Sequence, residues 1–188
     1  MYKLFISTDI YGFDLRAALG NISESRREKA LMFKHEQGQR ECVLAYLLLK
    51  QALREVYGID ENPEIVTLEG GKPMLKEHPE IHFNLSHCKS AVACVIGDEP
   101  IGVDLERIRR YNESLVRRVL NDEEQRNVEH AADKPREFIR FWTKKEAVLK
   151  LTGEGIRSDL KTVLTREKVA FEVTEGTDFI CTVSRFLV

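Results

Sequence analysis

Two acidic side chains within one short apolar stretch are the first candidates for chemistry in this sequence. Residues 101–106 read Ile-Gly-Val-Asp-Leu-Glu, which alternates with the period of a β-strand. Val103 and Leu105 would therefore point to one side, and Asp104 and Glu106 to the other. Carboxylates two residues apart on one face form either a solvated polar surface or part of a site for a hard cation such as Mg²⁺, which prefers oxygen ligands.

A second group of functional side chains lies on a predicted helix over residues 138–151. Trp142, Glu146 and Lys150 recur every four residues, so they share one stripe of the helix surface. The simplest interpretation is an exposed Glu–Lys pair, which stabilises a helix by about 0.3 kcal/mol. The apolar residues that surround the stripe instead favour a charged pair at the edge of a cleft.

A polar cluster at Ser86 and His87 ends a predicted strand over residues 81–85. His87 is either a structural hydrogen-bonding group or, together with Ser86, a binder of an anionic oxygen. Adjacent Ser and His residues do not usually meet as nucleophile and base, and the chain has no Gly-x-Ser-x-Gly. A serine hydrolase is therefore not expected.

Basic residues are placed where they could bind phosphates. They are Arg26, Lys29, Arg40 and Lys72. Each alone is typical of a solvated surface charge, but together with Ser86, His87 and Lys150 they could hold several phosphates. The chain contains neither Gly-x-x-x-x-Gly-Lys-Ser/Thr nor Gly-x-Gly-x-x-Gly, so a P-loop and a dinucleotide-binding fold are not indicated.

The composition indicates a globular protein with no bulk attraction for polyanions. The chain has 188 residues, of which 43% are hydrophobic and 32% are charged. Its formal net charge of −2 attracts neither nucleic acid nor anionic lipid. No stripe of basic residues alternates with aromatic ones, so nucleic-acid binding is not expected.

The sequence also predicts a cytoplasmic protein without a membrane segment. The apolar run at the N-terminus is too short for a signal peptide, and no run is long enough to span a bilayer. The cysteines show no Cys-x-x-Cys spacing, which predicts neither a zinc site nor a disulfide framework. They are Cys42, Cys88, Cys94 and Cys181.

Hydrophobic periodicity and turn residues outline the first half of the chain. The expected strands are 2–8, 64–68, 81–85, 91–96 and 101–105, with a turn at 70–73. Residues 8–20 show no regular pattern, and we expect a loop that could contain one turn of helix. One helix should start near Arg26, with Ser23 or Ser25 as its cap, and Ser25 with Glu28 fits a capping box. Gly38 should end this helix, and a second, well-buried helix should run over 39–57.

The second half should begin with helices and end with a hairpin. The expected helices begin near residue 112 or 114, after Asn121 and at Pro135, and Gly153 should end the last of them. Strands over 169–174 and 178–186 should form the hairpin. We therefore expect an α+β protein with two halves, residues 1–106 and 107–188.

Four sequence blocks together resemble the 4′-phosphopantetheinyl transferases of the Sfp type. The blocks are Gly71-Lys72-Pro73, Phe83-Asn84-Leu85-Ser86-His87, Gly102-Val103-Asp104-Leu105-Glu106 and Trp142-Thr143-Lys144-Lys145-Glu146-Ala147-Val148-Leu149-Lys150. They occur in the family's order and span residues 71–150. The last two blocks are the most specific, and residues 26–40 look similar too.

The resemblance implies a reaction and a metal site. The reaction would transfer phosphopantetheine from coenzyme A to a serine of an apo acyl or peptidyl carrier protein and release 3′,5′-ADP. Asp104, Glu106 and Glu146 would hold Mg²⁺, with Mn²⁺ as an alternative, against the coenzyme A pyrophosphate. Glu146 would also accept the serine proton, directly or through a metal-bound water.

The resemblance also implies how coenzyme A is bound. Lys150 and His87 would contact phosphate oxygens, and Ser86 and Lys72 would line the nucleotide site. The basic residues near the 3′-phosphate would be Arg26, Lys29 and Arg40. Arg26 stands where a lysine is common, which keeps the charge but changes the donor geometry.

The implied architecture is a monomer of two similar α+β halves, related by a pseudo-twofold axis, with one active site in the cleft between them. The family's carrier proteins are acidic, so a basic surface beside the cleft should dock them. The candidates, which could also be a merely solvated basic face, are Arg107, Arg109, Arg110, Arg117 and Arg118.

Two other functions remain open. The chain could be a non-catalytic module that binds coenzyme A or a carrier protein, although no metal carboxylate or motif lysine is missing from it. It could also be a different Mg²⁺-dependent nucleotide hydrolase, which would explain the carboxylates but not the order of the motifs.

Overall fold

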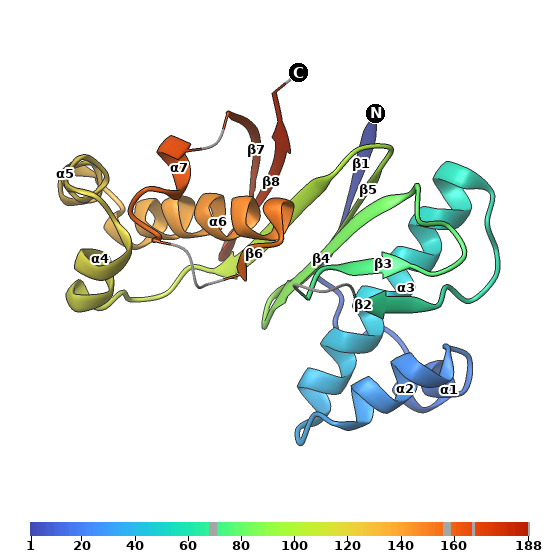
Figure 1. The fold of residues 1–188 in the computed structure, drawn as a ribbon. Coiled ribbons are helices and arrows are strands. Elements are labelled where there is room, and N and C mark those ends of the chain that lie inside the picture. The colour runs from blue at the N-terminus through green and yellow to red at the C-terminus, as the bar shows by residue number, and fades with distance from the viewer. Residues whose placement is uncertain (68–70, 156–158, 167, 188) are drawn as a thin grey trace.

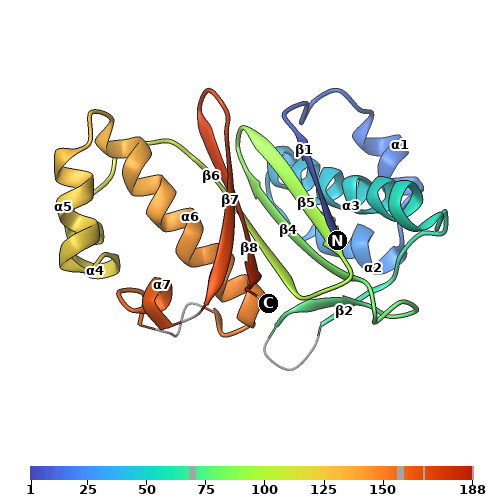
Figure 2. The same cartoon turned by 90° about the horizontal axis from the view of Figure 1, so that it is seen from above.

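Two three-stranded antiparallel sheets face each other at the centre of the molecule, and a long helix covers the outer side of each (Figures 1 and 2). The structure is a computed structural model that describes residues 1–67, 71–155, 159–166 and 168–187. Its mixture of helices and strands confirms the expected α+β class.

Along the described residues, the elements follow one another in this order. The first part contains β1 (Tyr2–Ser7), α1 (Leu15–Gly20), α2 (Glu24–Leu31), α3 (Glu36–Tyr57), β2 (Ile65–Thr67), β3 (Pro73–Leu75), β4 (His82–Cys88) and β5 (Ala91–Gly97). The second part contains β6 (Ile101–Arg107), α4 (Glu113–Val119), α5 (Asp122–His130), α6 (Lys134–Thr152), α7 (Val163–Arg166), β7 (Val169–Glu175) and β8 (Phe179–Phe186).

The first sheet has the strand order β1-β5-β4, and α3 packs on its outer face. Its central strand, β5, is buried on both sides. Val92 and Cys94 pack with side chains of α3, whereas Ala93 and Val95 face the second sheet. This double burial explains why β5 is an almost continuous apolar run and does not alternate with polar residues.

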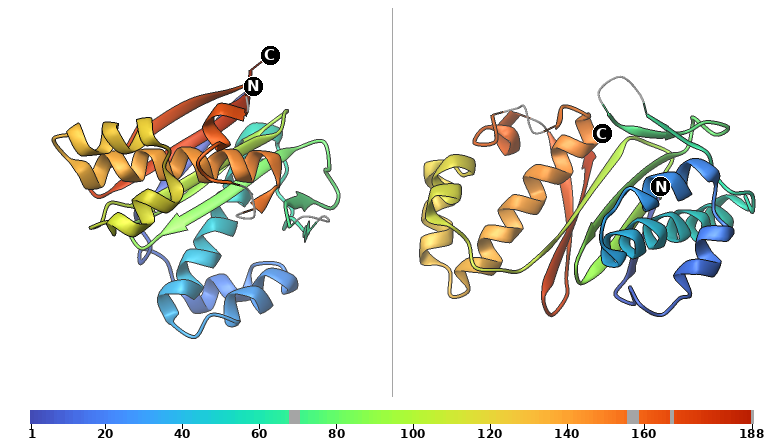
Figure 3. Two further views of the ribbon diagram at one scale, coloured as in Figure 1. Left: turned by 60° about the vertical axis from the view of Figure 1, so that its left-hand side comes forward. Right: turned by 90° about the horizontal axis from the view of Figure 1, so that it is seen from below.

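The second sheet has the order β6-β8-β7 and is covered by α6. Val103 and Leu105 of β6 pack against the first sheet, so Asp104 and Glu106 face α6. This arrangement confirms the two-sided character predicted for the strand. Helices α4 and α5 lie beside α6, on the side away from the first sheet (Figure 3).

The two halves share one topology. Each contains a strand, a long helix and a hairpin, and the first strand pairs with the last: β1, α3, β4, β5 and then β6, α6, β7, β8. A boundary after Glu106 would cut β6 from its own sheet, because all of β6 pairs with β8. We therefore propose a division in the turn at residues 98–100. The pseudo-twofold axis stays a prediction.

Polar side chains of β4 join the two sheets. Backbone N–H groups of β6 donate to them, from Val103 to Asn84 Oδ1 over 3.1 Å and from Leu105 to Ser86 Oγ over 3.0 Å. Asn84 and Ser86 are both buried. These bonds place the polar end of β4 directly beside Asp104.

Gly102 allows α6 to approach β6 closely. A Cβ atom at this position would lie 2.1 Å from the carbonyl oxygen of Ala147 and 2.6 Å from the nitrogen of Leu151. Both are backbone atoms, which cannot rotate away as a side chain can. The glycine therefore sets the distance at which the helix presents its side chains to Asp104 and Glu106.

We predict that Gly102→Ala lowers the free energy of unfolding by about 3 kcal/mol, because overpacking against a rigid backbone forces the helix to shift. Urea titration followed by circular dichroism measures the change. Gly20→Ala is the matched control, because a Cβ at the end of α1 meets no atom within 4 Å. Equal stability of the two variants would contradict the role assigned to Gly102.

Some local predictions need correction in the segment before α3. Gly38 does not separate α2 from α3, since the break lies at residues 32–35 and Gly38 is in the first turn of α3. A Cβ at Gly38 would lie 2.7 Å from the ring of Phe33, so the glycine serves packing. The capping box at Ser25 is also wrong, because Ser25 lies inside α2 and Ser23 is the N-cap.

The sequence predicted the well-capped helices but not the shortest elements. β3 and α7 are too short to show a period, whereas α1 lies in the segment where a loop with one turn of helix was expected. The predicted cap of α5 is confirmed, since Asn121 and Glu124 form a capping box, and Gly153 ends α6 with a φ of 80°. Of the predicted strand 64–68 and turn 70–73, residues 68–70 lie outside the described residues.

All four cysteines are free thiols in the structure. Within the described ranges, no helix combines the length and the hydropathy that crossing a bilayer requires.

Candidate functional site

A pocket of about 300 Å³ lies where β4, β6 and α6 meet. It gathers the side chains that the sequence singled out on three separate segments. Its lining residues include Ser86 and His87 from β4, Asp104 and Glu106 from β6, and Trp142, Glu146 and Lys150 from α6. The predicted catalytic and metal-binding residues therefore share one cavity.

Lys150 is held by two polar groups of the neighbouring strands. Its ammonium donates to Asp104 Oδ1 over 2.7 Å and to Ser86 Oγ over 2.9 Å. The Ser86 hydroxyl in turn donates to Asp104 Oδ1 over 3.1 Å and accepts from the backbone N–H of Leu105. Ser86 thus uses its one donor and two acceptor positions within the protein, and in this structure it positions Lys150 and Asp104.

Burial and neighbouring carboxylates raise the pKa values of two acids in this pocket, Glu146 and Glu106. Burial raises the pKa of Glu146 to about 7, with further contributions from Asp104 and Glu106 that outweigh the attraction of Lys150. Burial, followed by the charge of Asp104, also raises the pKa of Glu106. The charge of Arg109 partly offsets that rise, as does a weak hydrogen bond, 3.4 Å long, from Trp142 Nε1 to Glu106. The pocket therefore contains three carboxyl groups, whose negative charge the single lysine in its lining, Lys150, does not balance.

The donor set of this pocket fits a hard divalent cation. Asp104 Oδ2 and Glu146 Oε1 are buried oxygens with no hydrogen-bond partner, which is costly unless a ligand satisfies them. Carboxylate oxygens are the ligands that Mg²⁺ and Mn²⁺ accept. In the described part of the chain, however, no three acidic, His or Cys side chains are already closed around a common point. One oxygen of Asp104 is instead paired with Lys150.

A second pocket of about 390 Å³ adjoins the first and shares Leu85, His87 and Lys150 with it. Arg26 and Lys29 of α2 contribute positive charge to its wall, and Ser23 and Ser25 contribute hydroxyl groups. The combined cavity thus has an acidic end between β6 and α6 and a basic end beside α2. Such a division suits a ligand that carries both a metal-bound and a free phosphate group.

Arg26 is anchored to the wall of the second pocket. Its guanidinium donates to the carbonyl oxygen of Cys42 through Nε over 3.2 Å and through Nη2 over 2.7 Å. Burial lowers the pKa of Arg26, although nearby Cys42 and Tyr46 act in the opposite direction. Arginine remains charged at neutral pH, so this buried end of the cavity keeps a fixed cation.

Arg40 and Lys72 do not reach either pocket, although the sequence analysis placed both at the nucleotide site. Arg40 pairs with Glu36 over 2.7 Å and donates to the carbonyl oxygen of Phe13. Lys72, directly before β3, donates to the carbonyl oxygen of Leu151 over 2.8 Å and thereby links the start of β3 to the end of α6. Burial lowers the pKa of Lys72.

Sequence reasoning missed the contacts that two buried acidic residues make with other segments. Glu41 of α3 contacts His87 Nδ1 over 3.0 Å. Glu124 of α5 accepts from the fully buried ammonium of Lys145 over 2.8 Å, so this lysine of the helix motif faces away from the pocket. The only signal for Glu41 in the sequence is its charge within a strongly apolar helix.

The raised pKa of Glu146 predicts a pH dependence of stability in metal-free protein. Between the ordinary value of 4.5 and about 7, the folded state keeps a proton that the unfolded state has lost. The free energy of unfolding should therefore fall as the pH rises through this window. Urea titrations in EDTA should show a steeper fall for the wild type than for Glu146→Gln. Parallel curves would contradict the raised pKa.

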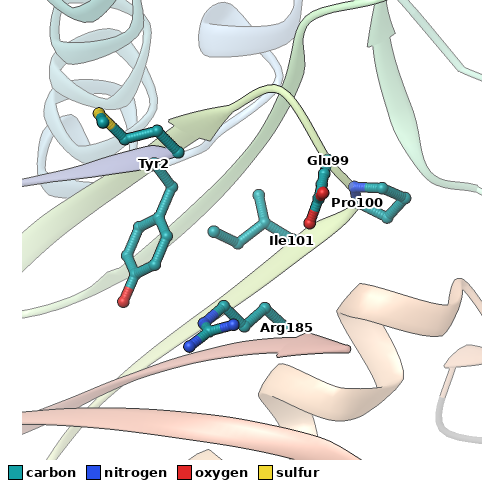
Figure 4. Close-up of a pocket in the computed structure, with 6 residues that line it drawn as sticks. Tyr2, Glu99, Pro100, Ile101 and Arg185 are labelled. Atoms are coloured by element: carbon teal, nitrogen blue, oxygen red, sulfur yellow. The ribbon is translucent and has the colours of Figure 1, made fainter. Parts of the chain in front are cut away.

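Another pocket, of about 290 Å³, lies at the opposite end of β6 (Figure 4). It is lined by the start of β1, the turn before β6 and Arg185 near the end of β8. Tyr2 and Arg185 approach it from facing sheets, as Figure 4 shows. None of the residues that the sequence analysis selected for chemistry belongs to its lining, so we place the candidate site at the other end of the strand.

Comparisons with known proteins all lead to the same protein family. Residues 100–185 match the family model of the 4′-phosphopantetheinyl transferase superfamily. The chain is 24% identical over 185 residues to a 4′-phosphopantetheinyl transferase of Bacillus subtilis, covering 94% of this chain and 82% of the relative. It is 29% identical to the transferase Sfp of Bacillus subtilis strain 168, covering 88% and 75%. It is also 32% identical to the transferase AcpT of Salmonella typhimurium, covering 72% and 71%.

Proposed function

Because the chain belongs to the 4′-phosphopantetheinyl transferase superfamily, we propose that it transfers 4′-phosphopantetheine from coenzyme A to a serine of an apo acyl or peptidyl carrier protein and releases 3′,5′-ADP. The observation that carries this proposal is the cluster of Asp104, Glu106, Glu146 and Lys150 in one pocket that opens onto a basic pocket. The family resemblance inferred from the four motifs is confirmed.

Coenzyme A would be divided between the two pockets. Arg26 and Lys29 would bind the 3′-phosphate of the ribose at the basic end, where Arg26 is already anchored. The pyrophosphate would lie where the pockets meet, at His87 and Lys150. Asp104, Glu106 and Glu146 would hold Mg²⁺, or Mn²⁺, which when bound neutralises charge on the pyrophosphate.

Glu146 would act as the general base. The serine oxygen forms a bond to the phosphorus of the pantetheine phosphate, and the bond from that phosphorus to the bridging oxygen breaks. The electron pair leaves with 3′,5′-ADP, and the hydroxyl proton passes to a carboxylate oxygen of Glu146. Its pKa of about 7 in the metal-free protein shows how strongly this buried carboxylate holds a proton.

Lys150 would stabilise the leaving group. In the structure its ammonium rests on Asp104 and Ser86, and its side chain is 31% exposed at the junction of the two pockets. A small rotation of its flexible stem would exchange the carboxylate for a phosphate oxygen. The lysine would then neutralise charge that develops as the pyrophosphate bond breaks.

The carrier protein would approach past Trp142. A groove of about 260 Å³ combines Arg109 and Arg110 with apolar side chains, and Trp142 lines both this groove and the acidic pocket. Of the other predicted docking residues, Arg107 pairs with Asp178 and Arg117 with Glu113. An acidic carrier surface on Arg109 and Arg110 would place its serine on the side of Glu146 that coenzyme A does not occupy.

We also propose that the protein acts as a monomer in the cytoplasm. One chain contributes both the β4–β6 side and the α6 side of the pocket, so no second subunit is needed to complete it. The free cysteines are compatible with a reducing compartment.

The test is the intact mass of an apo carrier protein after incubation with this protein, coenzyme A and Mg²⁺. We expect a gain equal to one phosphopantetheine group, together with stoichiometric 3′,5′-ADP. Binding of coenzyme A or carrier without a mass gain would instead identify a non-catalytic module. Breakdown of the nucleotide with an unmodified carrier would identify a hydrolase, and either outcome would overturn the proposal.

A further inference from the structure

The contact between Glu41 and His87 assigns a role to a buried acid outside the predicted site. We propose that Glu41 is a positioning residue that holds the His87 ring so that its second nitrogen faces the phosphates of coenzyme A. The inference rests on the proposed function, and it adds a residue to which neither the sequence motifs nor the comparisons give a role. Glu41 lies on α3, whereas His87 ends β4.

The hydrogen bond determines which ring nitrogen is available. Glu41 Oε2 lies 3.0 Å from His87 Nδ1, and the Glu41 side chain is only 11% exposed. An ionised carboxylate accepts hydrogen bonds and cannot donate them, so Nδ1 must carry the proton. Among the described residues, Nε2 of His87 has no hydrogen-bond partner, and His87 lines both pockets. Nε2 is therefore the nitrogen that a ligand would meet.

Glu41 itself lies behind the ring. It is buried and is not part of the lining of either pocket. Its charge is thus separated from a bound phosphate by the imidazole, which allows an acid to serve an anion-binding site. In many enzyme sites, a carboxylate accepts a hydrogen bond from the histidine nitrogen that faces away from the ligand. This bond fixes the orientation of the ring.

The segment of α3 around Glu41 is well anchored. Arg40 donates to the carbonyl oxygen of Phe13, and the carbonyl oxygen of Cys42 accepts the guanidinium of Arg26. Three consecutive residues of one helix turn therefore each contact a different neighbouring segment: Phe13, His87 and Arg26. A carboxylate held in this way can keep the ring in one orientation before the ligand binds. Less conformational entropy is then lost on binding.

Calorimetric titration of coenzyme A into the full chain tests the proposal. Glu41→Leu removes the acceptor but fills the space, and we expect it to raise Kd about tenfold, as loss of one hydrogen bond to a charged group would. Glu41→Gln keeps an acceptor oxygen for Nδ1 and should stay within about threefold of the wild type. In a His87→Ala background, Glu41→Leu should have no further effect, since Glu41 acts through the ring.

Several results would overturn the proposal. An effect of Glu41→Leu that is equal in the presence and absence of His87 would show that the acid acts by another route. An unchanged Kd for Glu41→Leu would show that Glu41 has no role in binding coenzyme A. If Glu41→Leu does not fold, long-range ¹H–¹⁵N spectra of the wild type, assigned with His87→Ala, decide the matter. The proposal requires a proton on Nδ1 of His87, and a ring protonated only at Nε2 contradicts it.

Failure of this inference is distinguishable from failure of the proposed function. If wild-type protein modifies the carrier but the Glu41 variants bind coenzyme A normally, only the role of Glu41 is lost. If the wild type binds coenzyme A and the variants behave as expected, but no carrier gains mass, the role of Glu41 stands and the transferase function is lost.

Discussion

Replacing Glu146 with glutamine should lower the rate of phosphopantetheine transfer by roughly 10²–10⁴-fold, the range by which a general base accelerates a reaction. Glutamine has the shape of glutamate but cannot take a proton from the carrier serine. It is also a weaker ligand for a divalent cation, so both proposed roles of Glu146 are lost together. The rate is measured from the mass of the carrier over time at saturating coenzyme A.

The same substitution should leave the protein folded. Glu146 Oε1 is buried without a hydrogen-bond partner, and burial with neighbouring carboxylates raises the pKa of this residue. Removing its charge therefore breaks no hydrogen bond of that oxygen and relieves repulsion with Asp104. The melting temperature above pH 7 should be equal to that of the wild type or higher.

A control separates the loss of a base from a general effect of lost charge. Glu129 is an exposed glutamate near the end of α5, outside the lining of both pockets. Glu129→Gln should transfer at the wild-type rate. Wild-type turnover by Glu146→Gln would rule out Glu146 as the base, whatever its stability.

Substitution of Asp104 should abolish the dependence of coenzyme A binding on the metal. Asp104 offers one oxygen to Lys150 and Ser86, while its second oxygen is buried and free of hydrogen bonds. That second oxygen is the one available to a cation. With Mg²⁺ present, wild-type protein should bind coenzyme A more tightly than in EDTA, whereas Asp104→Ala should bind equally in both buffers.

Two variants distinguish metal binding from structural damage at Asp104. Asp104→Ala leaves the ammonium of Lys150 without its charged partner, which costs about 3–5 kcal/mol when such a pair is buried, and less at this partly exposed lysine. Asp104→Asn keeps an acceptor for Lys150 and should be more stable, yet should show the same loss of metal dependence. Asp60→Asn, at an exposed residue outside the site, is the control. A metal-dependent affinity that survives in both Asp104 variants would contradict the ligand role.

The sequence predicted the elements that carry the site because their patterns are local. The two-residue period of β6 placed Asp104 and Glu106 on one face, and the structure confirms that face. The stripe on α6 brought Glu146 and Lys150 to one side of a helix whose end at Gly153 was expected. Such patterns depend on neighbours within a few residues, which a single sequence displays.

Pairings between distant segments could not be predicted in the same way. The sequence grouped β6 with the strands that precede it, but β6 pairs with β8, which lies more than seventy residues later. Sheet partners are chosen by how buried faces combine in the folded chain, and the local sequence does not encode that choice. The contact of Lys150 with Asp104, and that of Glu41 with His87, arise only from this assembly.

Charged residues were the least predictable part of the site. Arg26 reaches the basic pocket as expected, but Arg40 lies against Phe13 and Lys72 against the end of α6. Long cationic side chains reach many partners, so their position in the chain does not determine which one they contact. Lys145, which belongs to the helix motif, does not line the site. It is fully buried against Glu124 and stabilises the helix that bears Glu146.

The central claim is that Asp104, Glu106 and Glu146 bind the metal on which transfer depends. Anomalous diffraction from crystals of the protein with coenzyme A and Mn²⁺ tests it most directly. We predict an anomalous peak in the pocket between β6 and α6, bound by oxygens of these three side chains and by the coenzyme A pyrophosphate. Bound coenzyme A with Mn²⁺ elsewhere, or with no metal at these carboxylates, would contradict the account.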